Sequence, residues 1–393
     1  MGSTAESEPE VGGPDFTPEQ LARGRALRRA QLPWALGGRV AGLALTLLLG
    51  LTPAGAHLVT WAGGLFGGSR SARVLAGAAA LVLLGQLVAL PFGARVRSVR
   101  QAYGLVTQGW RGWAVDLLRG LALTLLIALP VALGLYALTG RSPGRWWLPA
   151  AAAAALLTVG FSFLFPLVVE PLFNRFTPLP AGELRDALLG LAERDGIRVR
   201  DVLVADASRR TTALNAYVSG LGATRRIVAY DTLLATADPR EVELVVAHEL
   251  GHVKHRDVLV GTVLGALGAA VAVAALGGLT GLPPLLSAAG VAVGGPHGGI
   301  ADPRSLPLLA ACATLLSALT GPLRCAASRR METRADRHAL ELTDDPGQFI
   351  AMQRRLALTN VADVDPPRVL QLLFATHPST ARRIAAARAW RRG

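Results

Sequence analysis

Six stretches of the chain contain no Asp, Glu, Lys or Arg, and each is long enough to cross a membrane as a helix. A helix rises about 1.5 Å per residue and the hydrocarbon core is about 30 Å thick, so about 20 apolar residues span it. A large soluble core rarely contains six such runs. They cover residues 40–69, 74–94, 120–140, 146–169, 258–301 and 305–323. The sequence therefore predicts a multi-span α-helical membrane protein with about six transmembrane helices.

The composition agrees with a membrane protein and argues against a transporter. Of the 393 residues, 51% are hydrophobic and only 17% are charged. The runs contain no Asp, Glu, Lys or Arg, the residues that ion and proton relays normally bury. Glu170, at the exit of the fourth run, is the exception, and we interpret it as an interfacial charge or a residue facing a water-filled cavity. Cys312 and Cys325 lie in or beside the last run, and we expect both to be reduced.

The net charge of +13 comes from 40 basic and 27 acidic residues. The arginines cluster beside the apolar runs rather than on one folded module, so we interpret them as topology signals and expect no nucleic-acid partner. By the positive-inside rule, the N-terminus, the second loop, the region after the fourth run and the C-terminus face the cytoplasm. The clusters that set this orientation are Arg23, Arg25, Arg28, Arg29, Arg95, Arg97, Arg100 and Arg111.

The region after the fourth run contains the motif H-E-x-x-H at residues 248–252. Asp238, Pro239 and Glu241 have the spacing of an N-cap, a first-turn proline and the acid of a capping box, so the sequence predicts a helix from Pro239 through the motif. Residues four apart share one helix face, which places His248 and His252 beside each other.

Two neutral imidazoles on adjacent turns can bind one Zn²⁺ at about 2.0–2.1 Å and leave room for a third ligand and a water. Zinc lowers the pKa of that water to about 7, and Glu249 can accept its proton during attack on a carbonyl. A chance match on an exposed helix is the alternative interpretation. The chain has only seven histidines, so we favour a hydrolytic zinc site with one Zn²⁺ per chain.

The composition from residue 171 to residue 257 is that of a water-soluble segment. Its patterns predict a helix over 180–193 and strands over 202–205, 215–218 and 227–230, with a Gly-rich turn at 220–224. A small sheet beside a zinc-binding helix indicates a zincin-like α+β catalytic unit. A peptide could lie along an exposed edge of this sheet by β-augmentation.

Topology selects a candidate for the third ligand. If 258–301 and 305–323 each cross the membrane once, the chain returns to the side of His248, and Glu332 and Asp336 arrive there on one helix face. Glu332 can then bind the metal while Asp336 hydrogen-bonds a ligating histidine. Two alternatives stay open: a solvated charged helix with no such role, and His255 as third ligand. His338 is interpreted as a surface residue or a partner of a ligand.

The expected organisation has five segments. A disordered basic tail (1–33) precedes four transmembrane helices (34–170) with a basic loop (95–117). The catalytic unit with the H-E-x-x-H helix (171–257) comes next, followed by two transmembrane helices with a Pro/Gly-rich loop (258–324). The last segment (325–393) is the C-terminal helical part of the catalytic unit and carries the third ligand.

Several motifs occur in one order from about residue 165 to residue 390. They are V-E-P-L-F-N-R-F-T-P-L at 169–179, L-N-A-Y-V-S-G-L-G-A-T-R-R-I-V-A-Y-D-T-L-L at 214–234, H-E-L-G-H at 248–252, M-E-T-R-A-D at 331–336 and T-H-P-S-T-A-R-R-I at 376–384. Together they resemble the integral-membrane CAAX prenyl protease type I family of zinc metalloproteases. The first 160 residues resemble that family only in having several spans.

The resemblance implies a zinc endopeptidase whose site faces a water-filled chamber between the spans. It implies that His248, His252 and Glu332 bind zinc and that Glu249 is the general base. Asn215 and His377 match positions that hold the substrate backbone or the developing oxyanion.

Two departures from the family leave the substrate open. Six spans are predicted where eukaryotic members have seven, and the continuation H-V-K-H-R-D is closer to membrane-bound quality-control zinc proteases. The expected partners are a peptide or protein substrate, prenylated or membrane-associated, and the lipid bilayer. Few lysines and many arginines are typical of a GC-rich bacterial genome, so we expect an integral plasma-membrane protein. A non-catalytic peptide-binding or transport protein is the alternative from another class.

Overall fold

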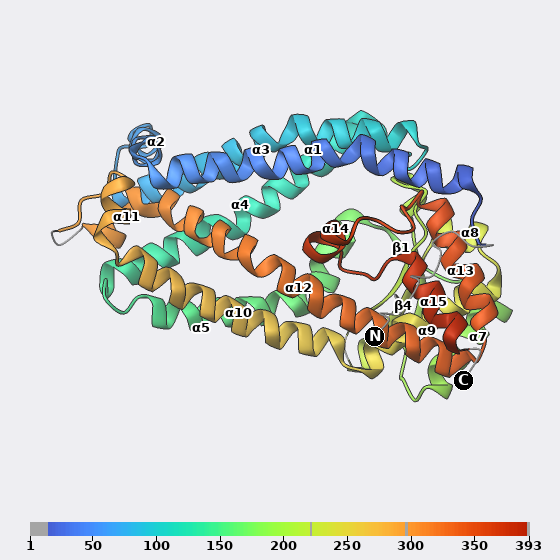
Figure 1. Ribbon diagram of the computed structural model, residues 1–393. Helices are drawn as coiled ribbons and strands as arrows, with labels where there is room; N and C mark the ends of the chain where they lie inside the picture. The colour runs from blue at the N-terminus through green and yellow to red at the C-terminus, as the bar shows by residue number, and fades with distance from the viewer. Residues whose placement is uncertain (1–14, 221, 295–297, 391–393) are drawn as a thin grey trace, which may run out of the picture.

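The computed structural model describes residues 15–220, 222–294 and 298–390. Long helices run side by side along the molecule, and a small sheet lies at one end among shorter helices (Figure 1). Within the described residues, six helical segments are long and apolar enough to cross a membrane, which confirms the predicted number. They are α1 (Pro18–Leu51), α3 (Arg70–Ala102), α4 (Trp110–Arg141), Trp147–Phe173, α10 (Asp257–Thr280) and Pro303–Thr343.

The six segments pack in a closed ring. Helix α1 contacts α3, α3 contacts α4, and α4 contacts α5 (Trp147–Leu164), which packs on α10. The ring closes through α12 (Leu306–Thr343), which contacts both α10 and α1. A π-helical turn (Phe165–Val169) and α6 (Glu170–Phe173) extend α5 toward the sheet. The ring therefore carries the chain directly into the end of the molecule that contains the sheet.

Two short helices lie at the opposite end of the ring, α2 (Pro53–Gly64) and α11 (Pro283–Ala288) (Figure 1). Helix α2 has 12 residues, which corresponds to about 18 Å and is too short to cross a bilayer. The apolar run 40–69 is divided because Thr52 caps a new helix that begins at Pro53. One charge-free run thus supplies the end of one span and a separate short helix.

Several predicted boundaries were wrong because a helix does not end where it leaves the hydrocarbon. The tail predicted over 1–33 is helical from Pro18, where Thr17 forms a capping box; residues 1–14 lie outside the described part. Most of the predicted basic loop 95–117 belongs to α3 and α4. Likewise, α12 continues without interruption through the predicted boundary at residue 324. Arginine is a good helix former, so arginine-rich turns extend these helices beyond the apolar run.

The sheet has four strands in the order β1-β2-β4-β3. Strands β2 and β4 are parallel, and the outer strands β1 and β3 pair antiparallel to them. The bounds are Phe176–Pro178 (β1), Asp201–Ala205 (β2), Ala216–Ser219 (β3) and Arg226–Tyr230 (β4). The three predicted strands are confirmed to within one residue. The prediction missed β1, which is three residues long, ends in proline and has no alternating apolar pattern.

The remaining helices lie at the same end of the molecule as the sheet (Figure 1). They are α7 (Glu183–Arg194), α8 (Asp231–Thr236), α9 (Pro239–Lys254), α13 (Pro346–Thr359), α14 (Arg368–Phe374) and α15 (Thr380–Trp390). Short 3₁₀ turns occupy Ala207–Arg209, Gly222–Thr224, Gly299–Ala301 and Pro303–Ser305. The apolar core of this end lies between the sheet and α7, α9 and α13, and it includes Leu188, Ile227, Leu250 and Phe349.

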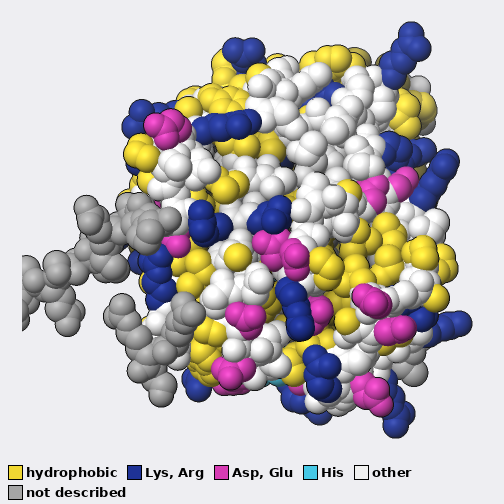
Figure 2. All heavy atoms as spheres, turned by 90° about the vertical axis from the view of Figure 1, so that its right-hand side faces the viewer, with side chains coloured by type: hydrophobic (Ala, Val, Ile, Leu, Met, Phe, Trp, Pro, Cys, Tyr) yellow, Lys and Arg dark blue, Asp and Glu magenta, His cyan; other side chains and the backbone are white. Residues whose placement is uncertain are grey.

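The two ends of the molecule have different surfaces. Figure 2 shows Lys, Arg, Asp and Glu side chains spread over the end that contains the sheet, between smaller apolar areas. On the spans, by contrast, Leu126, Leu156 and Leu319 are 72, 72 and 73% exposed. Side chains of this kind are stable on a surface only against lipid or another apolar partner. The α+β end therefore projects from a membrane-embedded helical ring, which confirms the predicted fold class.

Helix α9 crosses α12 closely at Gly251. A Cβ atom at this position would lie 3.0 Å from Cα of Ala335 and 3.1 Å from Cβ of His338. The predicted capping box fixes the start of α9, since the backbone amide of Asp238 donates to the Glu241 carboxylate while the Asp238 carboxylate accepts from the first turn. A small residue at 251 thus allows α9 to pack at close range against α12, which the chain reaches only after two further membrane crossings.

We expect Gly251→Val to force α9 and α12 apart and to lower the free energy of unfolding by about 1–3 kcal/mol, as overpacking does. The measurement is thermal unfolding of the full-length protein in detergent. Gly261→Val is the matched control, because nothing lies within 4 Å of a Cβ atom added at Gly261. Equal melting temperatures for the two variants would contradict the close crossing.

Candidate active site

The H-E-x-x-H helix brings three potential ligand groups together. The ring centroids of His248 and His252 lie 4.9 Å apart. One ligand atom from each of His248, Glu249 and His252 lies within 4.8 Å of the others. His248 is buried, and Glu249 and His252 are partly exposed. The side chains can therefore reach a common point while remaining open to a substrate on one side.

Helix α12 adds the carboxylate of Glu332 to this group. Oε2 of Glu332 lies 3.3 Å from Nε2 of His248, and Oε1 lies 3.6 Å from Nε2 of His252. Oε2 is buried and makes no hydrogen bond with the described residues. A buried carboxylate oxygen without a hydrogen bond is costly unless a cation or a donor occupies its vicinity. Two imidazole nitrogens and a carboxylate oxygen at one point thus fit a metal ion.

The alternative third ligand, His255, lies outside this group. Its ring packs edge-on against His338 at 5.8 Å between centroids. His338 is buried and its Nε2 is 2.9 Å from Oδ2 of Asp195. The interpretation of His338 as a surface residue was therefore wrong: it joins α12 to the end of α7. Sequence spacing alone did not reveal this, because Asp195 is far from His338 along the chain.

Each histidine of the motif has a carboxylate on its other ring nitrogen. Nδ1 of His248 lies 2.9 Å from Oδ1 of Asp336, at the position that sequence analysis selected. Nδ1 of His252 lies 2.8 Å from Oδ2 of Asp257, which sequence analysis did not select. Such contacts fix the ring orientation and make Nε2 the atom that is free to bind a metal.

Asp257 reaches His252 because the chain reverses between α9 and α10. Arg256 has a φ of 56°, in the left-handed region that ends a helix and redirects the backbone. Asp257 then begins α10 and is also paired with Arg334 of α12. The only available signal was an acidic residue five positions after His252, directly before an apolar run, and we interpreted it as the end of the soluble segment.

Arg383 of α15 is the second residue that sequence analysis did not select. Its Nε donates to Oδ2 of Asp336 at 2.8 Å, and a second guanidinium nitrogen contacts Oδ1 of the same carboxylate. Arg383 thereby holds Asp336 in place behind His248. It lies within the motif T-H-P-S-T-A-R-R-I, but the motif alone did not distinguish Arg383 from Arg382.

Asn215 and His377 border the same cavity as His248, Glu249 and Arg383, with a volume of about 410 Å³. Asn215 directly precedes β3, the edge strand beside α9. Nε2 of His377 lies 3.3 Å from Oε1 of Glu332, and its Nδ1 lies 2.9 Å from Oγ1 of Thr376. The structure thus brings together every site residue that the sequence indicated.

The electrostatics of the site favour a positive charge at its centre. Burial lowers the pKa of His248, but the carboxylates of Asp336 and Glu332 outweigh burial and raise this pKa to about 9. Burial raises the pKa of Glu249, and the neighbouring imidazoles oppose that change. A pocket that stabilises a cation beside a carboxylate with an elevated pKa suits a metal and a general base.

Comparison with known proteins now identifies the family. The model of peptidase family M48 matches residues 178–391, more than half of the chain. The chain belongs to peptidase family M48. The model described as CAAX prenyl protease N-terminal, five membrane helices, matches residues 3–175 of this M48 peptidase. The resemblance inferred from the motifs is thereby confirmed.

Curated relatives agree with this assignment. An uncharacterized metalloprotease, YhfN, of Bacillus subtilis is 34% identical over 77% of the M48 chain and 70% of its own length. CAAX prenyl protease 1 of Saccharomyces cerevisiae is 29% identical over 53% of the chain, and the rice homolog is 31% identical over 46%. These two alignments span only 45% and 43% of the relatives' own lengths.

The crystal structure of S. mikatae Ste24p has the same fold, with a TM-score of 0.85 and 22% identity over 98% of this chain and 92% of that one. The protein is thus a membrane M48 metallopeptidase similar to CAAX prenyl proteases, and its family implies a bound metal and a peptide or protein substrate. In the described part of the N-terminal region, four segments rather than five are long enough to span a membrane, since α2 is too short.

We expect Asp257→Asn to weaken metal binding by about 10–100-fold, because His252, a candidate metal ligand, loses its carboxylate partner. The measurement is a competition titration with a fluorescent chelator on the full-length protein. Asp365→Asn removes the same charge at an exposed residue and is the control. Equal affinities for the two variants would show that Asp257 does not support the site.

Proposed function

We propose that the chain is a membrane-embedded zinc metalloendopeptidase with His248, His252 and Glu332 as the zinc ligands. The observation that carries the proposal is the convergence of both Nε2 atoms and the Glu332 carboxylate from α9 and α12. Two imidazoles and one carboxylate are the donor set of catalytic zinc sites that keep a position open for a water or a substrate. Magnesium and calcium prefer oxygen donors, so these ligands favour zinc.

Residues of the chain carry out the other steps of the proposed reaction. Zinc in this position supplies Lewis acidity, which polarises a scissile carbonyl and acidifies a water. Glu249 accepts a proton from the attacking water, and its raised pKa suits a group that later returns the proton to the leaving amine. Asn215 and His377 donate hydrogen bonds to the substrate backbone or the developing oxyanion. Asp336, Asp257 and Arg383 hold the histidines in place.

The substrate peptide binds along the outer edge of β3. A peptide lying antiparallel or parallel to this strand pairs with backbone groups that have no strand partner on the outer side within the described sheet. It then passes Asn215 and reaches the cavity that contains Glu249. We also propose that this site faces the cytoplasm of a bacterial plasma membrane; the arginine clusters support the orientation through the positive-inside rule.

We expect Glu249→Gln to retain zinc and to reduce peptide hydrolysis by about 10²–10⁴-fold, since it loses the general base but no ligand. Zinc content and cleavage are measured on the same purified sample. Glu243→Gln, on the same helix and paired with Arg240 outside the cavity, is the control. Cleavage at the wild-type rate by the Glu249→Gln variant, or a wild-type protein that purifies with no zinc, would contradict the proposal.

A prenylated peptide is the substrate class that we propose. Related proteins in yeast and rice are named CAAX prenyl proteases. In this chain, α14 ends three residues before His377 and exposes apolar side chains, with Val369 64% and Leu372 58% exposed. This apolar surface beside the site could receive an isoprenoid chain. General membrane quality-control proteolysis, without a prenyl requirement, is the alternative.

We expect a farnesylated peptide to be cleaved with a kcat/KM at least about tenfold above that of the unmodified peptide, because burial of even a few CH₂ groups contributes about 0.8 kcal/mol each. Leu372→Gln should raise KM for the farnesylated peptide and leave hydrolysis of the unmodified peptide unchanged. Equal kcat/KM for the two peptides, or for unfolded casein, would favour quality-control proteolysis instead.

A further inference from the structure

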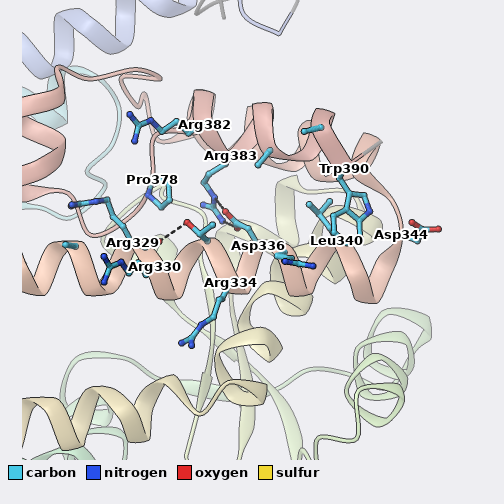
Figure 3. Close-up of a pocket in the computed structure, with 15 residues that line it drawn as sticks. Arg329, Arg330, Arg334, Asp336, Leu340, Asp344, Pro378, Arg382, Arg383 and Trp390 are labelled. Atoms are coloured by element: carbon cyan, nitrogen blue, oxygen red, sulfur yellow. Dashed lines mark hydrogen bonds and ion pairs between the residues drawn. The ribbon is translucent and has the colours of Figure 1, made fainter. Parts of the chain in front are cut away.

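An arginine-rich groove lies between α12 and α15 (Figure 3). Its volume is about 1310 Å³. In Figure 3, Arg329, Arg330 and Arg382 lie toward one end of the groove, and Leu340, Asp344 and Trp390 lie toward the other. The six arginines that line it are Arg329, Arg330, Arg334, Arg337, Arg382 and Arg383, against two acidic residues, Asp336 and Asp344.

Half of these arginines have an acidic partner. Arg334 pairs with Asp257, Arg337 with Glu341, and Arg383 with Asp336. The charge of these three side chains is therefore compensated by their neighbours.

The other three arginines have no acidic partner within the described residues. Nη1 of Arg329 donates to the carbonyl oxygens of Gln371 and Ala375 at 2.9 and 2.7 Å. The side chains of Arg330 and Arg382 are exposed, and among the described residues they make no hydrogen bond or ion pair. The end of the groove formed by these three residues thus carries an excess of positive charge.

The position of Arg330 on α12 places this end of the groove at the membrane surface. Leu319, Leu323, Ala326, Arg330 and Arg334 are separated by three or four residues and therefore share one helix face. Leu319 and Leu323 are 73% and 71% exposed on the apolar half of the helix. Arg330 follows Leu323 by about 10 Å along the axis, which is enough to carry it from the end of the apolar run through a headgroup layer about 5–8 Å deep.

Arg330 points away from the metal site, whereas Arg334 at the edge of the same face reaches Asp257. Glu332 follows Arg330 by two residues, which turns it by about 200° around the helix axis. Because Glu332 faces His248, Arg330 is directed to the other side of α12, the side on which Leu319 and Leu323 are exposed. A peptide held beside Glu249 for cleavage would lie on the opposite side of α12.

We infer that this groove binds the phosphate headgroup of an anionic phospholipid, from the leaflet on the catalytic side. The guanidinium groups of Arg330 and Arg382 are the principal phosphate contacts, and Arg329 and Arg334 flank them. Arginine presents a planar fork of donors that matches phosphate oxygens. Basic pockets between transmembrane helices at headgroup level are typical sites for anionic lipids. An acidic peptide segment fits the charge but not the outward, lipid-level position.

The test is native mass spectrometry of the full-length protein from micelles that contain equal amounts of phosphatidylglycerol and phosphatidylcholine. The wild-type protein should retain phosphatidylglycerol selectively, and R330Q/R382Q should lose this preference by on the order of tenfold. R330K/R382K keeps the charge without the fork and should show an intermediate preference. Its melting temperature, together with that of R330Q/R382Q, establishes that the variants are folded.

The matched control is R100Q/R111Q, which removes two exposed arginines from the basic ends of α3 and α4. This variant should keep the preference for phosphatidylglycerol. Equal lipid retention by R330Q/R382Q and R100Q/R111Q would overturn the inference. If millimolar inorganic phosphate displaced the lipid, the groove would be a site for free phosphate and the inference would be wrong. If an acidic peptide displaced the lipid, the groove would be a peptide site instead.

Discussion

The close crossing of α9 and α12 is the constraint on which the rest of the structure depends. One helix carries H-E-x-x-H, and the other returns from the far side of the membrane with Glu332. Gly251 permits the approach, since a Cβ atom there would lie 3.0 Å from Cα of Ala335. The metal site therefore lies between two helices that the chain can bring together only after two membrane crossings.

Local sequence rules predicted those parts of the protein whose causes are local. The capping box of Asp238 and Glu241 determined where α9 begins, and charge-free runs determined how many helices span the membrane. The position of Glu332 followed from counting crossings. Helix ends were predicted less well: α1 starts at Pro18 and α12 passes through residue 324, because charge marks the edge of the hydrocarbon and not the end of a helix.

Residues whose partners are distant in sequence could not be predicted. Arg383 acts on Asp336 from a helix 47 positions later, and no spacing rule connects the two. Asp257 contacts His252 because the left-handed backbone of Arg256 redirects the chain. The contact of His338 with Asp195 is of the same kind. Asp257 contacts His252, and Arg383 holds Asp336 against His248. The residues that could not be predicted are therefore those that fix the orientation of the two histidines through tertiary contacts.

The central claim is that α9 and α12 jointly supply the metal ligands. X-ray absorption at the zinc K-edge of the full-length protein tests it most directly. The account predicts a first coordination shell of nitrogen and oxygen scatterers at about 2.0–2.1 Å, two of them from imidazoles. In Glu332→Gln the imidazole signal should be unchanged and the first coordination shell should be altered. A sulfur shell at about 2.3 Å, or a spectrum that is identical in Glu332→Gln, would contradict it.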